Sequence, residues 1–530
     1  MISIIPKPNS LVQKEGYFEL KNCKAKNEFA EVEWFVNELL DELNLQGDEN
    51  GEVNIYVTNK SELEKEEYEL VISEKGVEVF ASNGNGAFYG LQTLKQILLQ
   101  NSVGQAGLTV PYVEIKDKPR FEYRSFMLDE ARHFFGKDIV KEMLDMMALL
   151  KLNRFHWHLT DDQGWRVEIK KYPLLTEKGT TRKSTQISWQ GVITKTPKND
   201  DKEYGKGCFY TQDELKELVE YAKKRYIEVC PEVDMPGHLY AAIACYPELS
   251  CFDEKVEVSN KWGIRKTIGC AGRHELYDFV HDVIDELSEI FPAGYFHIGG
   301  DEAPKDKWKE CPKCQQKMME QGLKNEDELQ AYFNNQIAEY LEKYGKRTVA
   351  WNEILKGEGV SDRTIVQLWL GNPNLNGVNK WLEKGNNVII SSKNNLYMDY
   401  PYGFETLKKS YQTDLELVGI DKKYEKQILG FEAPLWSEWV ATKDKLEFQV
   451  FPRMMSLAEI NWTYAENKDY EEFEARLKRI FEYMDKKNIS YASKEAFAPS
   501  GLSGLIRLVF AGQDMVLKPQ KEYETYKRIR

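Results

Sequence analysis

The sequence predicts an α/β protein in which a (β/α)8 barrel follows a small α/β domain. The first observation is the repeated order of strand, loop and amphipathic helix from residue 119 onward, which is typical of a parallel sheet. The second is the number of candidate strands, about eight, as a closed barrel requires. The third is the segment after the first of these strands, residues 129–133, which lacks the Gly-rich phosphate turn of a doubly wound sheet.

The length of 530 residues exceeds what one hydrophobic core usually holds, so more than one domain is expected. Residues 1–118 are predicted to form an N-terminal α/β support domain. It would contain a strand at 52–57, a hairpin at 68–72 and 77–80, and a helix at 87–99. Residues 119–489 are assigned to the barrel, and residues 490–530 form a C-terminal extension without an assigned role.

The eight barrel strands are predicted at residues 124–127, 154–159, 226–233, 295–298, 348–351, 365–369, 387–391 and 429–435. Amphipathic helices are predicted between most of them, at residues 137–150, 211–224, 274–290 and 326–344. Two more helices, at 451–462 and 469–487, would close the barrel. An extra strand is considered at 506–510.

Composition and charge exclude several classes of function. Hydrophobic residues make up 42% and charged residues 30% of the chain, as in globular proteins. The net charge of −14 argues against a nucleic-acid partner and against docking on an anionic membrane. Residues 1–6 lack the basic start and long apolar run of a secretory signal, and no stretch approaches the ~20 apolar residues of a membrane span. A cytoplasmic location is therefore expected. The alternative is a chain from which a secretory signal has been removed.

The 8 cysteines are scattered along the chain and do not form a disulfide framework. Cys311 and Cys314 form one C-x-x-C motif, whereas a zinc ribbon needs a second such pair, which the sequence lacks. We expect reduced structural thiols and neither a metal nor another cofactor. A local metal or disulfide is the alternative.

The stretch from Tyr295 to Glu302 organises the chain. An apolar, aromatic run predicts a buried strand, and two glycines then allow a sharp turn. Asp301 and Glu302 follow at the strand's end. Acid–base catalysis on an ether-like bond needs a pair of acids, because one donates a proton and the other carries negative charge. The alternative is an Asp-Glu pair that caps the next helix, with Pro304 as an early helical residue.

The other predicted strand ends also carry groups that suit a polyol ligand. Functional residues of a (β/α)8 barrel lie at the C-terminal ends of its strands. Aromatic faces there would stack on sugar C–H surfaces, while charged groups bind hydroxyls. The alternatives are a core position for each Trp, a helix cap for Asp161 and a turn for His238. The candidates are Arg132, Asp161, His238, Trp351, Trp369, Tyr397, Asp399, Trp436 and Glu438.

The motif His-x-Gly-Gly-Asp-Glu at residues 297–302 resembles the signature of family 20 glycoside hydrolases, the β-N-acetylhexosaminidases. The resemblance extends from Ile5 to about Trp462. Residues 86–94 resemble part of the small domain that precedes the barrel in this family. Further similar motifs lie at residues 128–133, 155–162, 236–238, 397–399 and 436–438, and at Trp351. The resemblance implies a barrel that bears the active site, and substrate-assisted catalysis with retention of configuration and no cofactor.

The resemblance also implies a role for each candidate. Glu302 would be the general acid and then the general base, with a pKa raised towards ~6 by an apolar site. Asp301 would hold the N–H of the substrate's 2-acetamido group and stabilise the oxazolinium-like cation, and Tyr397 would bind the acetamido oxygen. The pocket walls would be Trp351, Trp369 and Trp436. The ring hydroxyls would be bound by Arg132, Asp399 and Glu438. A network that positions Glu302 would be formed by Asp161 and His238.

The implied activity is that of an exo-acting β-N-acetylhexosaminidase, which releases terminal non-reducing β-linked GlcNAc or GalNAc from a glycan. Two alternatives are a disaccharide-releasing member of the same family and a barrel that binds sugar without cutting it. The natural glycan, its linkage and the oligomeric state are left open.

Overall fold

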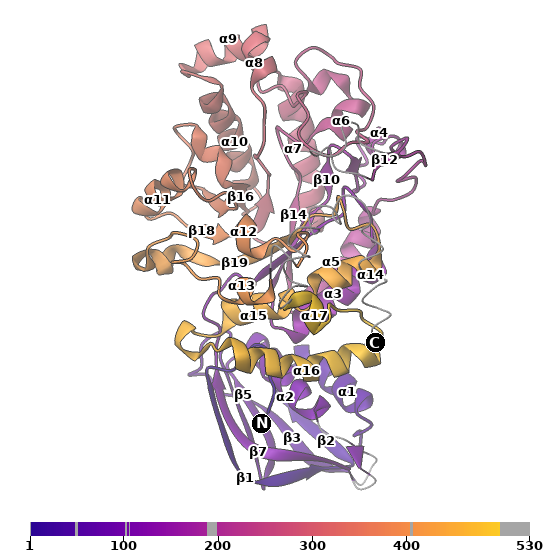
Figure 1. Ribbon diagram of the computed structural model, residues 1–530, viewed down its shortest axis with the longest axis vertical. Coiled ribbons are helices and arrows are strands. Elements are labelled where there is room, and N and C mark those ends of the chain that lie inside the picture. The colour runs from indigo at the N-terminus through magenta and orange to yellow at the C-terminus, as the bar shows by residue number, and fades with distance from the viewer. Residues whose placement is uncertain are drawn as a thin grey trace.

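The computed structural model describes residues 2–47, 51–100, 103–104, 107–187, 199–402 and 406–498. An N-terminal sheet occupies the lower part of Figure 1, and a closed barrel lies above it. Helix α16, Tyr470–Lys487, runs across the junction between the two parts. Its Arg476 side chain donates to the Ile4 carbonyl, so the last long helix ties the start of the chain to the barrel.

The N-terminal sheet has seven strands in the order β1-β7-β4-β5-β3-β2, with β6 paired to β7. The predicted strand at 52–57, the hairpin and the helix are all present. Asn83 caps the helix by accepting from the N–H groups of Asn85 and Gly86. The elements are β1 Ser10–Leu20, β2 Cys23–Asn27, α1 Glu33–Glu42, β3 Glu52–Asn59, β4 Tyr68–Ser73, β5 Gly76–Ala81, α2 Gly84–Leu99, β6 Val103–Gly104 and β7 Gly107–Asp117.

The eight predicted barrel strands all form, and each pairs in parallel with its neighbours until the sheet closes on itself. Most of their side chains are buried, as expected when both faces of a sheet are covered. The predicted bounds of every strand lie within a few residues of the observed ones. The strands are β8 Ser125–Asp129, β9 Arg154–His158, β14 Glu228–Glu232, β15 Tyr295–His297, β16 Arg347–Trp351, β17 Thr364–Leu368, β18 Val388–Ile390 and β19 Ile428–Leu435.

The predicted helices surround the barrel in Figure 1. Thr211 and Glu214 form a capping box at the start of α5, which explains why that helix begins there. The main helices are α3 Lys137–Leu149, α5 Gln212–Lys224, α7 His274–Ile290, α10 Glu326–Glu342, α15 Arg453–Trp462 and α16.

Shorter elements occupy the loops. The helices are α4 Leu174–Glu177, α6 Tyr240–Cys245, α8 Asp306–Glu310, α9 Pro312–Gln321, α11 Leu375–Glu383, α12 Lys393–Leu396, α13 Leu407–Tyr411, α14 Lys443–Val450 and α17 Lys494–Phe497. The strands are β10 Thr160–Asp161, β11 Gly164–Trp165, β12 Thr185–Gln186 and β13 Asn199–Asp200. The 3-10 helices are Ala30–Val32, Pro247–Leu249, Asn352–Lys356, Lys422–Gln427 and Ala465–Asn467. The strand considered at 506–510 lies outside the described residues.

Buried ionic contacts join the sheet to the barrel. Arg124, just before β8, is fully buried and donates to both carboxylate oxygens of Glu66, at 2.8 and 3.0 Å. Asp117, at the end of β7, accepts from the Trp462 indole at 2.9 Å and lies 3.4 Å from the buried Lys151 ammonium. Because breaking a buried ion pair leaves a charge uncompensated, these contacts fix how the two parts sit together.

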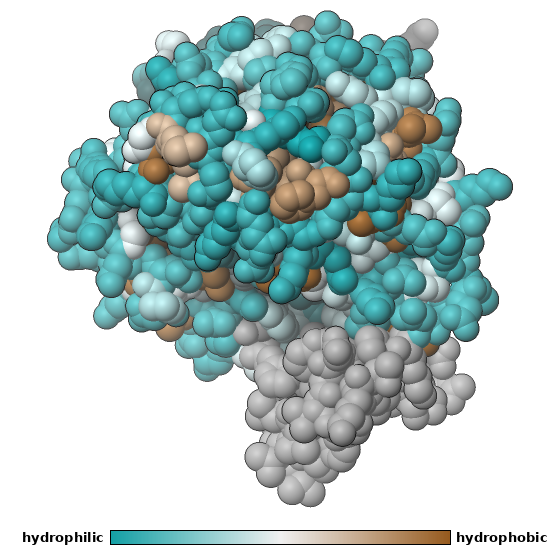
Figure 2. All heavy atoms as spheres, turned by 90° about the horizontal axis from the view of Figure 1, so that it is seen from above, coloured by the Kyte–Doolittle hydropathy of each residue, from teal (hydrophilic) through white to brown (hydrophobic). Residues whose placement is uncertain are grey.

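The face of the molecule that is seen from above is mainly polar. Figure 2, a view from above, shows predominantly hydrophilic side chains with small, separated hydrophobic patches. Within the described residues, no helix has the length and apolar character that crossing a membrane requires.

Candidate active site

A glycine turn aims the two candidate carboxylates at the mouth of the barrel. Gly299 and Gly300, after β15, have φ angles of +66° and +94°. A Cβ on Gly299 would lie 1.8 Å from the Asp234 carboxylate, so only glycine fits there. Glu302 is itself in the left-handed region, at φ +44°, which is uncommon for a residue with a side chain and is found at functional sites.

The alternative interpretation of this Asp-Glu pair as a helix cap is wrong. Helix α8 begins at Asp306, and its N-cap residue is Lys305, so the two acids lie outside the helix. Asp301 is buried, whereas Glu302 is partly exposed at the mouth.

His238 connects the candidate acids to Asp161. It follows β14, and its Nε2 lies 3.6 Å from Glu302 Oε2 and 3.8 Å from Asp301 Oδ2. Its Nδ1 lies 3.2 Å from Asp161 Oδ1. Burial lowers the pKa of His238, but the Asp161 carboxylate, together with Asp162 and Glu302, raises it, so that the net pKa lies well above its usual value. The imidazole is therefore positively charged at neutral pH and faces Glu302.

The expectation that the pKa of Glu302 is raised is wrong for this structure. Burial raises it, but the hydrogen bond and charge of His238 lower it more, with a further contribution from Arg132, and the net pKa lies below the usual value. A protonated imidazole stabilises the carboxylate form. The sequence showed both residues but not their separation, on which the sign of the shift depends.

Asp301 behaves in the opposite way. Burial raises its pKa to about 7, the positive charge of His238 opposes this, and the negative charge of Glu302 adds to it. The adjacent Asp234 is fully buried, and its own pKa is raised well above the usual value by burial and by Asp301. The environments of Asp301 and Glu302 thus shift the pKa values of these two neighbouring acids in opposite directions.

Arg132 is held in one orientation by partners on three sides. Its guanidinium lies 2.7 Å from Asp161 Oδ2 and 3.2 Å from Asp129 Oδ2, and its Nε donates to Gln163 at 3.0 Å. The guanidinium also lies over the Trp436 ring, 5.1 Å from the centroid. This planar fork is pre-organised to bind oxygen atoms of a ligand.

Four aromatic side chains from separate strand ends meet in one group. Trp369 and Tyr397 are stacked with centroids 6.3 Å apart, and Tyr397 lies 6.2 Å from Trp436. Trp436 in turn lies 5.9 Å from Trp351. Together with Met127, these rings form a cluster separate from the main core. Trp351 and Trp369 are buried, as a core position would also predict, but they pack in this separate group at the strand ends, which is suited to enclosing an apolar face of a ligand.

Several polar atoms at the mouth have no hydrogen-bond partner among the described residues. They are Asp301 Oδ1, Trp369 Nε1 and Asp399 Oδ1. Burial, and then the negative charge of Glu438, raises the pKa of Asp399 to about 8. Buried polar atoms are rarely left unpaired, so these atoms mark where a ligand would supply donors and acceptors.

The polar core below this pocket was not predicted from the sequence. Glu232, on β14, accepts from the Trp351 indole at 3.0 Å and lies 2.8 Å from His297 Nδ1. His156 lies between Glu232, at 3.1 Å, and Glu432, at 2.9 Å. A buried network of this kind orients Trp351 from behind. The signal was the His-Trp-His alternation in β9, which directs two histidines to the barrel interior.

The (β/α)8 fold, the acid pair and the aromatic group define a glycoside hydrolase. Comparison with protein families matches residues 121–465 to the glycosyl hydrolase family 20 catalytic domain and residues 1–118 to domain 2 of the same family. The chain belongs to glycosyl hydrolase family 20.

The names of individual similar proteins agree with this family assignment. A β-hexosaminidase of Porphyromonas gingivalis is 37% identical over 95% of this chain, which spans 66% of that protein's length. A β-hexosaminidase of Akkermansia muciniphila is 34% identical over 78% of this chain and 83% of its own. The crystal structure of a β-N-acetylhexosaminidase from Bacteroides fragilis has a TM-score of 0.79 and 29% identity, covering 95% of this chain and 99% of its own. An exo β-N-acetylglucosaminidase from Vibrio harveyi, in complex with N-acetylglucosamine, has a TM-score of 0.79 and 28% identity, covering 92% of this chain and 78% of its own.

Proposed function

We propose that this chain is an exo-acting β-N-acetylhexosaminidase that releases terminal non-reducing β-linked GlcNAc or GalNAc by a retaining, substrate-assisted mechanism. The observation that carries the proposal is the Asp301–Glu302 pair. Asp301 presents an unpartnered buried oxygen beside Tyr397, and Glu302 faces the open mouth next to a charged His238.

In the first step, the acetamido oxygen of the substrate attacks the anomeric carbon. Asp301 accepts a hydrogen bond from the acetamido N–H and balances the positive charge that develops on the ring. Tyr397 donates a hydrogen bond to the acetamido oxygen. The nucleophile is tethered to the substrate, so its effective concentration is high. The aromatic group of Trp351, Trp369 and Trp436 excludes water, which strengthens the attraction between the Asp301 carboxylate and the cation.

The His238–Glu302 pair supplies the proton that the leaving oxygen requires. The two side chains share one proton, which lies on His238 in the free enzyme and passes through Glu302 to the glycosidic oxygen. In the second step Glu302 accepts a proton from water, which opens the oxazolinium ring. Asp161 is a positioning residue, because it contacts His238 and Arg132 rather than the substrate.

The hydroxyl-binding groups favour a site for one sugar ring. Arg132, Asp399 and Glu438 are linked by their charges, because Glu438 contributes to the pKa shifts of both of the others. Three such groups around one ring would block a second sugar on the non-reducing side. A sugar-binding barrel without activity would have no use for the pair formed by Asp301 and Glu302.

Hydrolysis of aryl β-GlcNAc, β-GalNAc and β-glucoside, side by side, tests the proposal. Both N-acetylated substrates should be cleaved, and the glucoside, which has no acetamido nucleophile, should be inert. Rapid cleavage of the glucoside would require a nucleophile from the enzyme and contradict the mechanism. Cleavage of an aryl disaccharide, without cleavage of the aryl monosaccharides, would favour the disaccharide-releasing alternative.

Further parts of the proposal rest on the sequence. Residues 1–118 would support the barrel, residues 119–489 would carry the active site, and residues 490–530 have no assigned role. The partner would be a glycan rather than a nucleic acid, since the net charge of −14 repels phosphates. The cytoplasmic location stays a prediction.

A further inference from the structure

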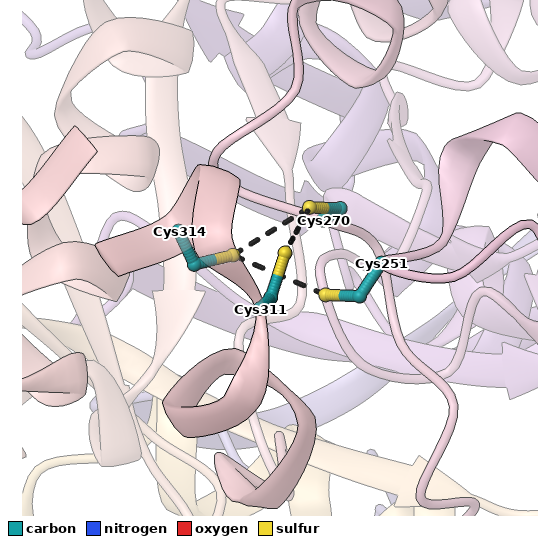
Figure 3. A group of neighbouring side chains, drawn as sticks. All are labelled: Cys251, Cys270, Cys311 and Cys314. Carbon is teal, nitrogen blue, oxygen red and sulfur yellow. Dashed lines mark hydrogen bonds between the residues drawn. The ribbon is translucent and has the colours of Figure 1, made fainter. Parts of the chain in front are cut away.

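Four buried cysteines meet at one point beside the active-site loops. Cys251 and Cys270 belong to the segment between β14 and β15, and Cys311 and Cys314 belong to the segment between β15 and β16. All four are buried and free of disulfides, and their sulfur atoms lie within 4.8 Å of one another. Figure 3 shows the four side chains pointing toward a common centre.

The distances suit one metal ion better than two disulfides. The Cys270 sulfur lies 3.5 Å from that of Cys314 and 3.7 Å from that of Cys311, and the Cys251 sulfur lies 3.9 Å from that of Cys314. Tetrahedral Zn²⁺ with Zn–S bonds of about 2.3 Å places its sulfur ligands about 3.8 Å apart. Cys270 and Cys314 each approach two other thiols, whereas disulfides would divide the cysteines into exclusive pairs.

The backbone around the cluster holds the first two thiols side by side. Ser250 and Gly269 form an antiparallel bridge, and the Cys270 N–H donates to the Leu249 carbonyl at 2.8 Å. These contacts bring the two ends of segment 251–270 together. The first two ligands are therefore positioned by the fold itself.

The second two thiols lie at the beginning of α9. Cys311 is the N-cap residue, Pro312 is the first helical residue, and Cys314 lies in the first turn. The positive end of the helix dipole there favours thiolates over thiols. Gly272 packs directly on this turn, since a Cβ on it would lie 2.3 Å from the Lys313 carbonyl carbon. The two segments thus approach each other more closely than any other residue at 272 would allow.

We propose that Cys251, Cys270, Cys311 and Cys314 bind one structural Zn²⁺ ion. A closed Cys₄ set leaves no open coordination position, so the ion would stabilise the fold and take no part in the chemistry. The ion would join the segment between β14 and β15, which contains His238, to the segment between β15 and β16, which contains Glu302. The Trp308 indole, which donates to the Gly269 carbonyl at 2.9 Å, reinforces the same junction. This inference departs from the sequence-based expectation of thiols without a metal.

Metal analysis of the full chain, purified under reducing conditions without added metal, tests the proposal. Elemental mass spectrometry should find about one zinc per chain. A mercurial that blocks thiols should release this zinc to a colorimetric chelator. Replacement by Co²⁺ should give the intense sulfur-to-cobalt charge-transfer absorption of a tetrahedral tetrathiolate site.

Variants locate the ion. Cys251→Ser and Cys314→Ser should each lose most of the zinc and melt at a lower temperature. Cys208→Ser is the matched control, because Cys208 lies outside the cluster and should leave the zinc content unchanged. If a serine variant does not fold, Cys311→His retains a Cys₃His ligand set and should keep the metal with an altered cobalt spectrum.

The proposal is overturned if the wild-type chain neither contains zinc nor takes up Zn²⁺ or Co²⁺ after reduction. Iron in place of zinc would overturn the assignment of the metal. Disulfides among these four cysteines in the reduced, freshly purified protein would overturn the site.

Discussion

The His238 imidazole lies between two carboxylates, with Nδ1 3.2 Å from Asp161 Oδ1 and Nε2 3.6 Å from Glu302 Oε2. Asp161, on one side of the ring, stabilises the positive charge of the imidazole, and this charge acts on Glu302 on the other side. Asp161 raises the pKa of His238, and His238 lowers the pKa of Glu302. The protonation of the proposed general acid thus depends on a residue that does not contact the substrate.

The Asp161→Asn variant tests this relay. Loss of the Asp161 charge lowers the pKa of His238, so the His238–Glu302 pair should lose its shared proton at a lower pH. The basic limb of the profile of kcat/KM against pH should move to lower pH. A fall in kcat/KM with an unmoved basic limb would show that Asp161 only supports the fold. In a His238→Gln background, Asp161→Asn should not move the limb further.

Glu302 and Asp301 are expected to differ in how their loss depends on the leaving group. Glu302→Gln should severely slow the cleavage of glycans, whose alcohol leaving groups need a proton, and slow nitrophenyl glycosides less. Asp301→Asn should slow both substrates by similar factors, on the order of 10²–10³, because the acetamido group is common to them. The measurement is kcat/KM for two leaving groups of different acidity. The opposite pattern would mean that the two roles are exchanged.

Asp301 should reduce stability at neutral pH. Its pKa in the folded protein, about 7, lies above the ordinary value of 3.8, so the folded state disfavours the carboxylate. The cost to folding is absent below the unfolded pKa and complete above the folded pKa. The melting temperature of Asp301→Asn relative to wild type should therefore rise as pH increases from about 4 to about 7. A difference that is independent of pH would contradict the shift.

Arg132→Lys should weaken substrate binding although the charge is kept. Lysine has no planar fork and cannot bind Asp129, Asp161 and Gln163 while it lies over Trp436. One lost charged hydrogen bond of about 1.5–3 kcal/mol corresponds to a fall in kcat/KM of about 10- to 100-fold. KM should carry much of the change. An unaltered KM would place the guanidinium away from the sugar.

Glu66→Gln should destabilise the junction of the sheet and the barrel. The variant leaves the fully buried Arg124 guanidinium without its carboxylate partner, at a cost of about 3 kcal/mol. Chemical denaturation measures the loss. Glu64→Gln is the matched control, because the Glu64–Lys118 pair is exposed and should contribute less than about 1 kcal/mol. Equal losses in the two variants would contradict the importance of burial.

The sequence by itself determined the elements and the location of the site. Apolar periodicity is a local property, so the eight strands and the long helices could be predicted within a few residues of their observed bounds. Parallel strands of a barrel end at one mouth, so Arg132, His238 and Glu302 could be predicted to share a pocket although they lie far apart in the chain.

Only the tertiary structure decided the properties that depend on distances across the barrel. Burial of Glu302 raises its pKa. The net pKa is lowered because His238 lies close enough for its hydrogen bond and positive charge, together with Arg132, to outweigh that effect. The network of Glu232 with His156 and His297 brings together three strands. The four-cysteine cluster joins one C-x-x-C motif to Cys251 and Cys270, whose spacing in the sequence has no metal-binding pattern. Electrostatic energies and metal coordination vary steeply over a few ångströms, and such separations are set only when the sheet closes.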